Sequence, residues 1–245
     1  MKAMIFAAGL GTRLRPLTDQ IPKALVPVNG MPLLEIQIRK LKSIGINEII
    51  VNVHHMAGEI KKFLKSKDHF GIRIEVSDES DQLLDTGGGI ANASWFFKAD
   101  ENFLVHNVDI LTNINLGSLV QKHKDTGALA TLAVRLRKSS RYLLFDSKNR
   151  LTGWKNEKTG ELIRCGTATI EKTLAFSGIH VINARIFNLM QNAGKFSIIK
   201  TYLSLAPANL IYGLEDSGSY WFDVGTLQKL AEAEAFIRQK NIEIV

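Results

Sequence analysis

A glycine-rich segment near the start of the chain has the residue types needed to bind an anion. It covers Ala7–Arg13, reads Ala-Ala-Gly-Leu-Gly-Thr-Arg, and follows an apolar run that predicts a buried strand. Because glycine has no side chain, its backbone N–H groups can approach a phosphate closely and surround it. Two other phosphate-binding patterns fail on spacing: Leu14 stands where G-x-G-x-x-G needs its third glycine, and Gly-Lys-Ser/Thr is absent. A turn that only joins a strand to the next element is the alternative interpretation.

The segment that follows is rich in proline and carries positive charge. Four of the chain's five prolines fall within residues 16–32, which predicts a stiff, extended loop rather than a helix. Arg15 and Lys23 lie in this loop, and Arg13 stands just before it. Holding these cations together on a rigid loop is unfavourable unless an anion is bound there. A solvated basic loop is the alternative for Arg15.

A second glycine-rich segment, Asp85–Gly89, reads Asp-Thr-Gly-Gly-Gly and opens a predicted helix. The bare backbone at Gly87 and Gly88 suits contact with a flat ring through N–H and C=O groups. A helix N-terminus also favours an anion. A flexible turn is the alternative.

Two aspartates end predicted strands. In the strand Asn102–Asp109, Asn107 and Asp109 share one face and come at the carboxyl end. Ligands of open α/β sheets bind at that edge. Asp223 ends the strand Tyr220–Val224 in the same way. If the two aspartates meet, their carboxylates suit a Mg²⁺ ion that carries phosphate oxygens, whereas capping of the following turns is the alternative role.

Two other polar pairs favour no catalytic role. His54-His55 has neither a second histidine at helical spacing nor a cysteine partner, which argues against a metal site. Glu157-Lys158 precedes Thr159-Gly160 in a polar stretch that is more typical of a hairpin turn than of a substrate contact. No Ser-His-Asp or Cys-His set for nucleophilic catalysis stands out.

The elements that must position these residues alternate along the chain. Strands are predicted over Lys2–Ala8, Glu48–Val53, Ile72–Val76, Asn102–Asp109, Ala128–Arg135, Leu174–Val181, Leu210–Leu214 and Tyr220–Val224. Helices are predicted over Pro32–Ile44, Ala57–Lys65, Gly89–Phe97, Leu116–Asp125, Ala184–Asn192, Ser197–Leu205 and Leu227–Gln239. This alternation predicts βαβ units around a mostly parallel central sheet, a Rossmann-like α/β fold.

The alternation breaks between Tyr142 and Glu161. Turn signals at Asp146–Asn149 and Asn156–Gly160 predict hairpins added beside the main sheet. The chain contains no Pro/Ser-rich linker and no internal repeat, so we expect a single domain over residues 1–245.

Composition excludes several classes of protein. With 45% hydrophobic residues and a net charge of +7, the 245-residue chain is neither disordered nor of low complexity. The single cysteine, Cys165, excludes an internal disulfide and fits a reducing cytosol. The basic cluster Arg135–Lys138 is short and lacks interleaved aromatic residues, which argues against nucleic acid as a partner. The apolar run Ala3–Leu10 has no cleavage pattern and no apolar stretch is long enough to span a bilayer, so we expect a cytoplasmic protein without a membrane partner.

Taken together, the motifs resemble the sugar-1-phosphate nucleotidyltransferase family. Its pattern Ala-Ala-Gly-x-Gly-Thr-Arg, Pro-x-Thr, Pro-Lys and Pro-Val-x-Gly-x-Pro is matched within residues 7–32. Later pieces, Thr86–Gly89, Phe176–Ile179 and Asp223–Leu227, are most similar to N-acetylmuramate-1-phosphate uridylyltransferases within the mannose-1-phosphate guanylyltransferase-like group. The resemblance therefore covers essentially the whole chain and implies the nucleotide-diphospho-sugar transferase fold.

The resemblance also implies roles for particular residues. Arg13 would neutralise the departing pyrophosphate, Lys23 would contact the α-phosphate and the sugar phosphate, and Asp109 would complete the catalytic set. Asp109 and Asp223 would hold Mg²⁺, and Gly178 would line the sugar side through its backbone. The implied nucleotide contacts are Ala7, Ala8, Gly9, Gly11, Thr12, Gly87, Gly88 and Asn107.

The chain departs from the family pattern at two places. Val108 stands between Asn107 and Asp109 where the family usually has glycine. The approach to Thr86 is also a residue longer than in the muramate enzymes, which bears on base contacts before Asp85.

The implied reaction transfers a nucleotidyl group from a nucleoside triphosphate, with UTP favoured, to a sugar 1-phosphate, and it releases pyrophosphate. An N-acetylated hexose phosphate is favoured, with N-acetylmuramate 1-phosphate first, which would place the product in cell-wall nucleotide-sugar synthesis. Sugar choice would depend on Leu136–Thr169, where Arg137, Lys138 or Arg141 would suit a lactyl carboxylate. The alternatives are a GTP-dependent mannose-1-phosphate guanylyltransferase and a nucleotide-sugar binding module without turnover.

Overall fold

The computed structural model describes residues 1–191 and 193–243 and divides the chain into two compact units. Unit 1 comprises Met1–Leu83, His106–Asn113 and Tyr220–Val245, and unit 2 comprises Leu84–Val105 and Ile114–Ser219. Unit 1 therefore gathers segments that are distant in sequence, whereas unit 2 is continuous apart from residues 106–113. The expectation of one domain over residues 1–245 stays a prediction.

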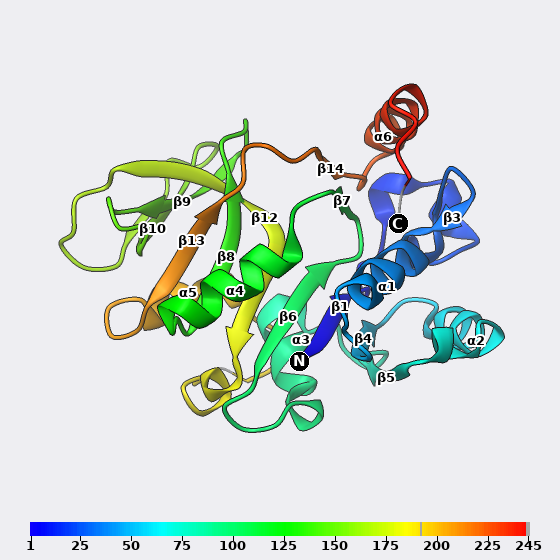
Figure 1. Ribbon diagram of the computed structural model, residues 1–245, viewed down its shortest axis with the longest axis horizontal. Helices are drawn as coiled ribbons and strands as arrows, with labels where there is room; N and C mark the ends of the chain where they lie inside the picture. The colour runs from blue at the N-terminus through cyan, green and yellow to red at the C-terminus, as the bar shows by residue number, and fades with distance from the viewer. Residues whose placement is uncertain (192, 244–245) are drawn as a thin grey trace. The chain divides into compact units, whose positions relative to one another are not determined.

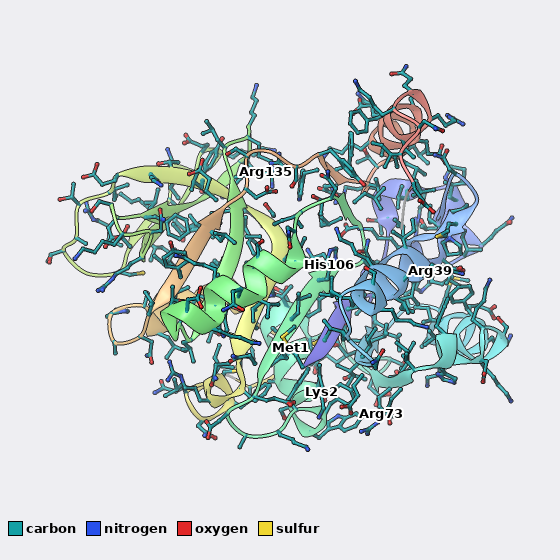
Figure 2. All side chains as sticks on the ribbon, viewed as in Figure 1. Met1, Lys2, Arg39, Arg73, His106 and Arg135 are labelled. Atoms are coloured by element: carbon teal, nitrogen blue, oxygen red, sulfur yellow. The ribbon has the colours of Figure 1, made fainter. Side chains whose placement is uncertain are left out.

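Unit 1 is built on three parallel strands, β1 (Lys2–Phe6), β4 (Glu48–Val53) and β5 (Arg73–Asp78), with β4 in the middle. Apolar residues at consecutive positions of β1 and β4 are fully buried, as expected of a strand covered on both faces. Figure 2 shows Lys2 and Arg73 at the amino ends of their strands. The carboxyl ends, where the glycine-rich segment begins, lie at the opposite edge.

The helices of unit 1 are α1 (Leu33–Ser43), α2 (Ala57–Ser66) and α6 (Leu227–Gln239). The apolar face of α1 is buried, and Thr226 caps α6 by accepting a hydrogen bond from the Lys229 backbone. Two short antiparallel pairs complete the unit. They are β2 (Pro27–Val28) with β3 (Met31–Pro32), and β7 (Ile110–Thr112) with β14 (Trp221–Asp223).

The proline-rich loop is more helical than its sequence indicates. Instead of a wholly extended loop, the chain forms 3₁₀ turns at Thr12–Leu14, Leu17–Asp19 and Lys23–Leu25. Pro16 and Pro22 stand directly before the second and third turns. The fixed φ of proline suits the start of a helical turn, so proline here shortens helices without excluding them.

In unit 2 the long strand β12 (Lys172–Asn183) pairs antiparallel with β8 (Ala130–Arg135) and with β9 (Arg141–Phe145). Strand β13 (Ile211–Glu215) pairs parallel with β8. Strands β10 (Leu151–Asn156) and β11 (Leu162–Arg164) extend β9 as the expected antiparallel hairpins. The hairpin turns predicted at Asp146–Asn149 and Asn156–Gly160 are confirmed.

The helices of unit 2 are α3 (Asp85–Asn92), α4 (Leu116–Thr126) and α5 (Ile198–Leu205). Figure 1 shows α4 crossing the face formed by β8, β12 and β13. Strand β6 (Asn102–Asn107) gives its first four residues to this unit and its last two to unit 1. Further 3₁₀ turns lie at Asp68–Gly71 in unit 1 and at Ser94–Phe96 and Ala184–Asn188 in unit 2.

The predicted α/β class, with a mostly parallel central sheet and added hairpins, is confirmed. Three local expectations differ from the structure. The helix expected from Gly89 begins at Asp85, β7 was not expected, and Ala184–Asn192 is a 3₁₀ turn as far as Asn188, with Asn192 outside the described residues. In residues 1–191 and 193–243, no helix combines the length and apolar character that crossing a bilayer requires.

Candidate active site

The glycine-rich segment starts where β1 ends and is fixed there by a buried polar chain. The Ala7 amide donates to Asn52 Oδ1 at 2.8 Å, and Asn52 Nδ2 donates to Glu79 Oε1 at 2.7 Å. Asn52 lies on β4, and Glu79 directly follows β5. Ala7 and Ala8 are buried, whereas Gly9 and Thr12 are exposed. The segment is thus anchored at its start and open further along.

Gly11 is required by its surroundings. Its φ is +67°, and a Cβ atom there would lie 2.8 Å from Thr18 Cγ2 and 3.0 Å from Lys23 Cβ. The Thr18 hydroxyl donates to the Gly11 carbonyl at 2.8 Å. Lys23 Cδ lies 3.9 Å from the position that a Cβ on Gly9 would take. The Lys23 side chain therefore runs along the glycine-rich segment.

Lys23 and Asp109, which are far apart in sequence, form an ion pair between Nζ and Oδ2. Their side chains are only 12% and 17% exposed. Lys23 opens the 3₁₀ turn after Pro22, and Asp109 lies in the short connection between β6 and β7. The structure thus brings two of the three expected catalytic residues together.

Asp223 lies next to Asp109 along the backbone. Strand β14 pairs with β7 so that Asp223 stands opposite Ile110, and the Val224 amide donates to the Asp109 carbonyl at 3.0 Å. Asp223 Oδ1 accepts from the Gly225 amide at 3.0 Å, and Oδ2 lies 3.4 Å from Lys229 Nζ. The segments that carry the two aspartates therefore adjoin, and a meeting of the two carboxylates stays a prediction.

Arg13 packs against the segment that carries Asp223. A Cβ atom on Gly225 would lie 2.8 Å from an Arg13 guanidinium nitrogen and 2.8 Å from Asp223 Oδ1. The absence of a side chain at Gly225 therefore makes room for Arg13. All three expected catalytic residues and both expected metal ligands lie in unit 1.

This donor set fits Mg²⁺. Carboxylate oxygens are hard ligands, and Mg²⁺ typically takes one or two of them together with substrate phosphates and water. Within the described residues there is no group of three or more His, Cys, Asp or Glu side chains that could hold a metal. His54 Nδ1 contacts the Glu79 carbonyl at 2.6 Å.

Asn107 and Val108 lead into the Asp109 connection. Asn107 is half-buried at the end of β6. Val108, where the family usually has glycine, is only 3% exposed, and its amide donates to the Phe6 carbonyl at 3.1 Å. Its branched side chain is therefore packed in the apolar interior.

In unit 2, Gly87 and Gly88 approach another segment closely. Their amides donate to the Phe196 carbonyl at 2.8 Å and 3.2 Å. A Cβ atom on Gly87 would meet the Phe196 ring, and one on Gly88 would meet the Gly194 carbonyl. Close packing thus accounts for both glycines, and the expected contact with a base stays a prediction.

Gly178 is buried in β12 with a φ of +79°. It lies where the register of β12 against β8 shifts between Phe176 and His180. A positive φ at an irregular strand position favours glycine, because a Cβ atom would be strained there. Its predicted role at the sugar is untested.

A basic pocket lies beside this part of unit 2. Its volume is about 500 Å³, and it is lined by Leu136, Arg137, Lys138, Tyr142, Lys155, Glu157 and Thr173. Arg137 donates to the Phe176 carbonyl at 3.0 Å, which links the pocket to the β12 irregularity. Lys155 pairs with Glu157, and its Nζ lies 5.4 Å from the Tyr142 ring centroid.

Sequence reasoning named two of these pocket residues, Arg137 and Lys138, and missed Lys155 and Tyr142. Strand pairing brings the missed residues together, because Lys155 of β10 stands opposite Tyr142 of β9. A cross-strand register of this kind has no signature in a single sequence.

Comparison with known proteins identifies the family of the chain. The model of the nucleotidyl transferase family matches residues 2–240. An N-acetylmuramate alpha-1-phosphate uridylyltransferase from Caulobacter vibrioides is 32% identical over 95% of both chains. A mannose-1-phosphate guanyltransferase from Yarrowia lipolytica is 29% identical over 92% of this chain and 61% of its own.

Another relative, a UTP–glucose-1-phosphate uridylyltransferase from Synechocystis sp., is 35% identical over 55% of this chain, which spans only 37% of that protein. Among solved structures, a UDP-glucose pyrophosphorylase from Acinetobacter baumanii superposes with a TM-score of 0.78 over 99% of this chain and 95% of its own, at 20% identity. That likeness concerns the fold. By the family match over residues 2–240, the chain belongs to the nucleotidyl transferase family.

Proposed function

We propose that the protein transfers a nucleotidyl group from a nucleoside triphosphate to a sugar 1-phosphate. The observation that carries the proposal is the Lys23–Asp109 ion pair, held beside Asp223 and along the glycine-rich segment that follows β1. This arrangement supplies one cation, two carboxylates and a bare backbone at the ligand-binding edge of a parallel sheet. Such a set suits polyphosphate chemistry.

In the proposed reaction, an oxygen of the sugar phosphate attacks the α-phosphorus of the triphosphate in line. One P–O bond forms as the bond to the β-phosphate breaks, and pyrophosphate leaves with its electron pair. The reaction depends on positioning and charge neutralisation rather than on a protein nucleophile. Lys23 would neutralise charge that develops on the α-phosphate, and Arg13 would do so for the pyrophosphate.

Asp109 and Asp223 would hold Mg²⁺, which supplies charge neutralisation and alignment of the phosphate oxygens. Lys23 Nζ is paired with Asp109 Oδ2, so the lysine that would contact the phosphates lies against a carboxylate that would hold the metal. Lys23 would turn from Asp109 to the phosphates as substrate binds. The pair is thus a preorganised pair of charges rather than a structural salt bridge.

For the substrates we propose UTP and N-acetylmuramate 1-phosphate, with the product used in cell-wall synthesis. Support comes from the Caulobacter relative, which is similar over 95% of both chains, and from the basic pocket whose Arg137 donates to the Phe176 carbonyl of β12. That pocket presents three cationic side chains against one carboxylate, a balance that suits the lactyl carboxylate. GTP with mannose 1-phosphate is the second candidate, supported by the Yarrowia relative.

A matrix of pyrophosphate-release assays tests the proposal, with the four nucleoside triphosphates against the 1-phosphates of N-acetylmuramate, N-acetylglucosamine, glucose and mannose. We expect the highest kcat/KM for UTP with N-acetylmuramate 1-phosphate. The highest value for GTP with mannose 1-phosphate would overturn the substrate choice and leave the reaction standing. If no substrate pair releases pyrophosphate but the protein still binds a nucleotide-sugar, the result would indicate the non-catalytic binding module.

The pocket can be tested separately through Lys138→Gln. We expect KM for N-acetylmuramate 1-phosphate to rise about tenfold, because one charge-assisted contact is lost. KM for N-acetylglucosamine 1-phosphate, which has no lactyl carboxylate, should stay unchanged. Lys148→Gln is the matched control, since Lys148 is an exposed lysine in the β9–β10 turn of the same unit. Equal effects on both sugars would remove the pocket from sugar selection.

A further inference from the structure

Gln37 is a buried amide side chain that holds the backbone on both sides of Asp109. It lies on α1 with only 1% of its surface exposed. Its Nε2 atom donates to the Val108 carbonyl at 3.3 Å and to the Ile110 carbonyl at 2.9 Å. The two carbonyls flank the residue whose carboxylate pairs with Lys23. Gln37 thus contacts the main chain that carries Asp109, and its burial keeps it from the substrates.

The carbonyls of residues 108–112 alternate between two partners. The Asp109 carbonyl accepts from the Val224 amide of the β14 side. The carbonyls of Val108 and Ile110 accept from Gln37, and that of Thr112 accepts from Lys40. Successive carbonyls of an extended chain point in opposite directions, so one edge faces β14 and the other faces α1.

Side chains of α1 therefore donate hydrogen bonds to the carbonyls on the free edge of β7, where a neighbouring strand would otherwise do so. Gln37 and Lys40 are three residues apart, so they lie on one face of the helix. Gln37 contacts the two carbonyls adjacent to Asp109, whereas Lys40 donates to the Thr112 carbonyl. The placement of Asp109 is consequently coupled to α1 through one amide group.

The other end of the Gln37 side chain argues against a purely space-filling role. Its Oε1 atom is buried and has no hydrogen-bond partner among the described residues. A buried polar atom without a partner is unfavourable, and a leucine of similar size would avoid that loss. The benefit of glutamine at this position must therefore come from the two hydrogen bonds that its amide nitrogen donates.

We propose that Gln37 is a positioning residue for Asp109, holding that carboxylate where Lys23 and the metal require it. This inference rests on the proposed nucleotidyl transfer and on Asp109 as a Mg²⁺ ligand. It extends that function to a residue that contacts neither substrate nor metal. No local sequence pattern points to Gln37, because it stands in the middle of an amphipathic helix.

The test compares Gln37→Leu with Leu41→Ala. Leu41 is fully buried on the same helix, and its apolar side chain cannot donate to the carbonyls beside Asp109, so its truncation tests loss of packing without loss of those hydrogen bonds. The first readout is Mn²⁺ binding, by electron paramagnetic resonance, in the presence of a non-hydrolysable UTP analogue. The second is the kcat and KM of pyrophosphate release.

We expect Gln37→Leu to weaken Mn²⁺ binding and to lower kcat by about 10–100-fold each, the usual effect of losing a residue that orients a metal ligand. KM for the sugar phosphate should stay near the wild-type value. Leu41→Ala should lower the melting temperature and leave both Mn²⁺ affinity and kcat near wild type. If Gln37→Leu does not fold, Gln37→Asn, which withdraws the amide by one methylene group, should show the same two losses.

Unchanged Mn²⁺ affinity and kcat in the folded Gln37 variant would overturn the positioning role, as would equal losses in Leu41→Ala. Failure of the proposed function gives a different result. The wild-type protein would then release no pyrophosphate with any substrate pair. The Mn²⁺ affinities of the Gln37 and Leu41 variants would still show whether Gln37 positions Asp109.

Discussion

Replacement of Gly11 by alanine should damage both stability and turnover, because its Cβ atom would press on Lys23. Gly11 has a φ of +67°, and the new atom would lie 2.8 Å from Thr18 Cγ2 and 3.0 Å from Lys23 Cβ. Gly45 provides a matched control. It also has a positive φ, +82°, but nothing lies within 4 Å of the position its Cβ would take.

The two variants separate backbone strain from collision. The left-handed conformation costs an alanine about 1–2 kcal/mol, partly offset by the smaller entropy of the unfolded chain, so Gly45→Ala should lose about 1 kcal/mol. Gly11→Ala adds overpacking of about 2 kcal/mol, for about 3 kcal/mol in all. For a chain of this length the melting temperature should fall by about 3 °C and about 9 °C, respectively.

The effect on turnover follows from the ion pair. Moving Lys23 Cβ by a few tenths of an ångström shifts the Nζ atom that meets Asp109, so we expect kcat of Gly11→Ala to fall at least about tenfold. Gly45→Ala should retain wild-type kcat. Calorimetry and a pyrophosphate-release assay measure the two quantities. Equal melting temperatures and equal kcat values in the two variants would refute the assignment of Lys23 and Gly11 to one site.

Three further predictions concern the carboxylates, the lysine and a buried histidine. Asp109→Asn and Asp223→Asn should each lower kcat by at least about 100-fold, with folding intact by circular dichroism, and EDTA should abolish a wild-type activity that Mg²⁺ restores. Near-normal rates in both variants would refute the metal assignment. Lys23→Ala should lower kcat more than it weakens equilibrium binding of UTP, because the negative charge that Lys23 neutralises increases in the transition state. A rise in KM at unchanged kcat would indicate that Lys23 only binds the substrate. Burial lowers the pKa of His180 from 6.5 to about 3, so the unfolded chain binds a proton that the native protein excludes over that range. The unfolding free energy should therefore fall by about 2 kcal/mol from this residue between about pH 7 and pH 5, a dependence that urea titration of His180→Gln should lack.

The regular elements could be predicted because their residue patterns are local. Strand β4 and helix α6 begin and end where the sequence indicates, at Glu48–Val53 and Leu227–Gln239. A continuous apolar run identifies a buried strand, and Thr226 marks the start of a helix by its capping oxygen. Strand β7 was not predicted, since three residues are too few to display a period.

The candidate site could be predicted as a set of residues but not as a set of contacts. The proline-rich loop and the strand ends pointed to Lys23, Asp109 and Asp223. The adjacency of the Asp109 and Asp223 segments depends on β14 lying against β7, a register that no single sequence displays. Gly87 and Gly88 were predicted to contact a base, but their amides donate hydrogen bonds to the Phe196 carbonyl. Phe196 lies more than a hundred positions away, and no local sequence pattern connects it to the two glycines.

If Lys23, Asp109 and Asp223 serve transfer of a nucleotidyl group, the α-phosphate of the triphosphate must end in the product. The protein is incubated with UTP that carries a radioactive α-phosphate, with N-acetylmuramate 1-phosphate and with Mg²⁺, and the products are separated. We predict that the label enters a nucleotide-sugar, that pyrophosphate forms in equal amount, and that Asp109→Asn loses both products. Label that remains in UTP, or release of inorganic phosphate in place of pyrophosphate, would contradict the account.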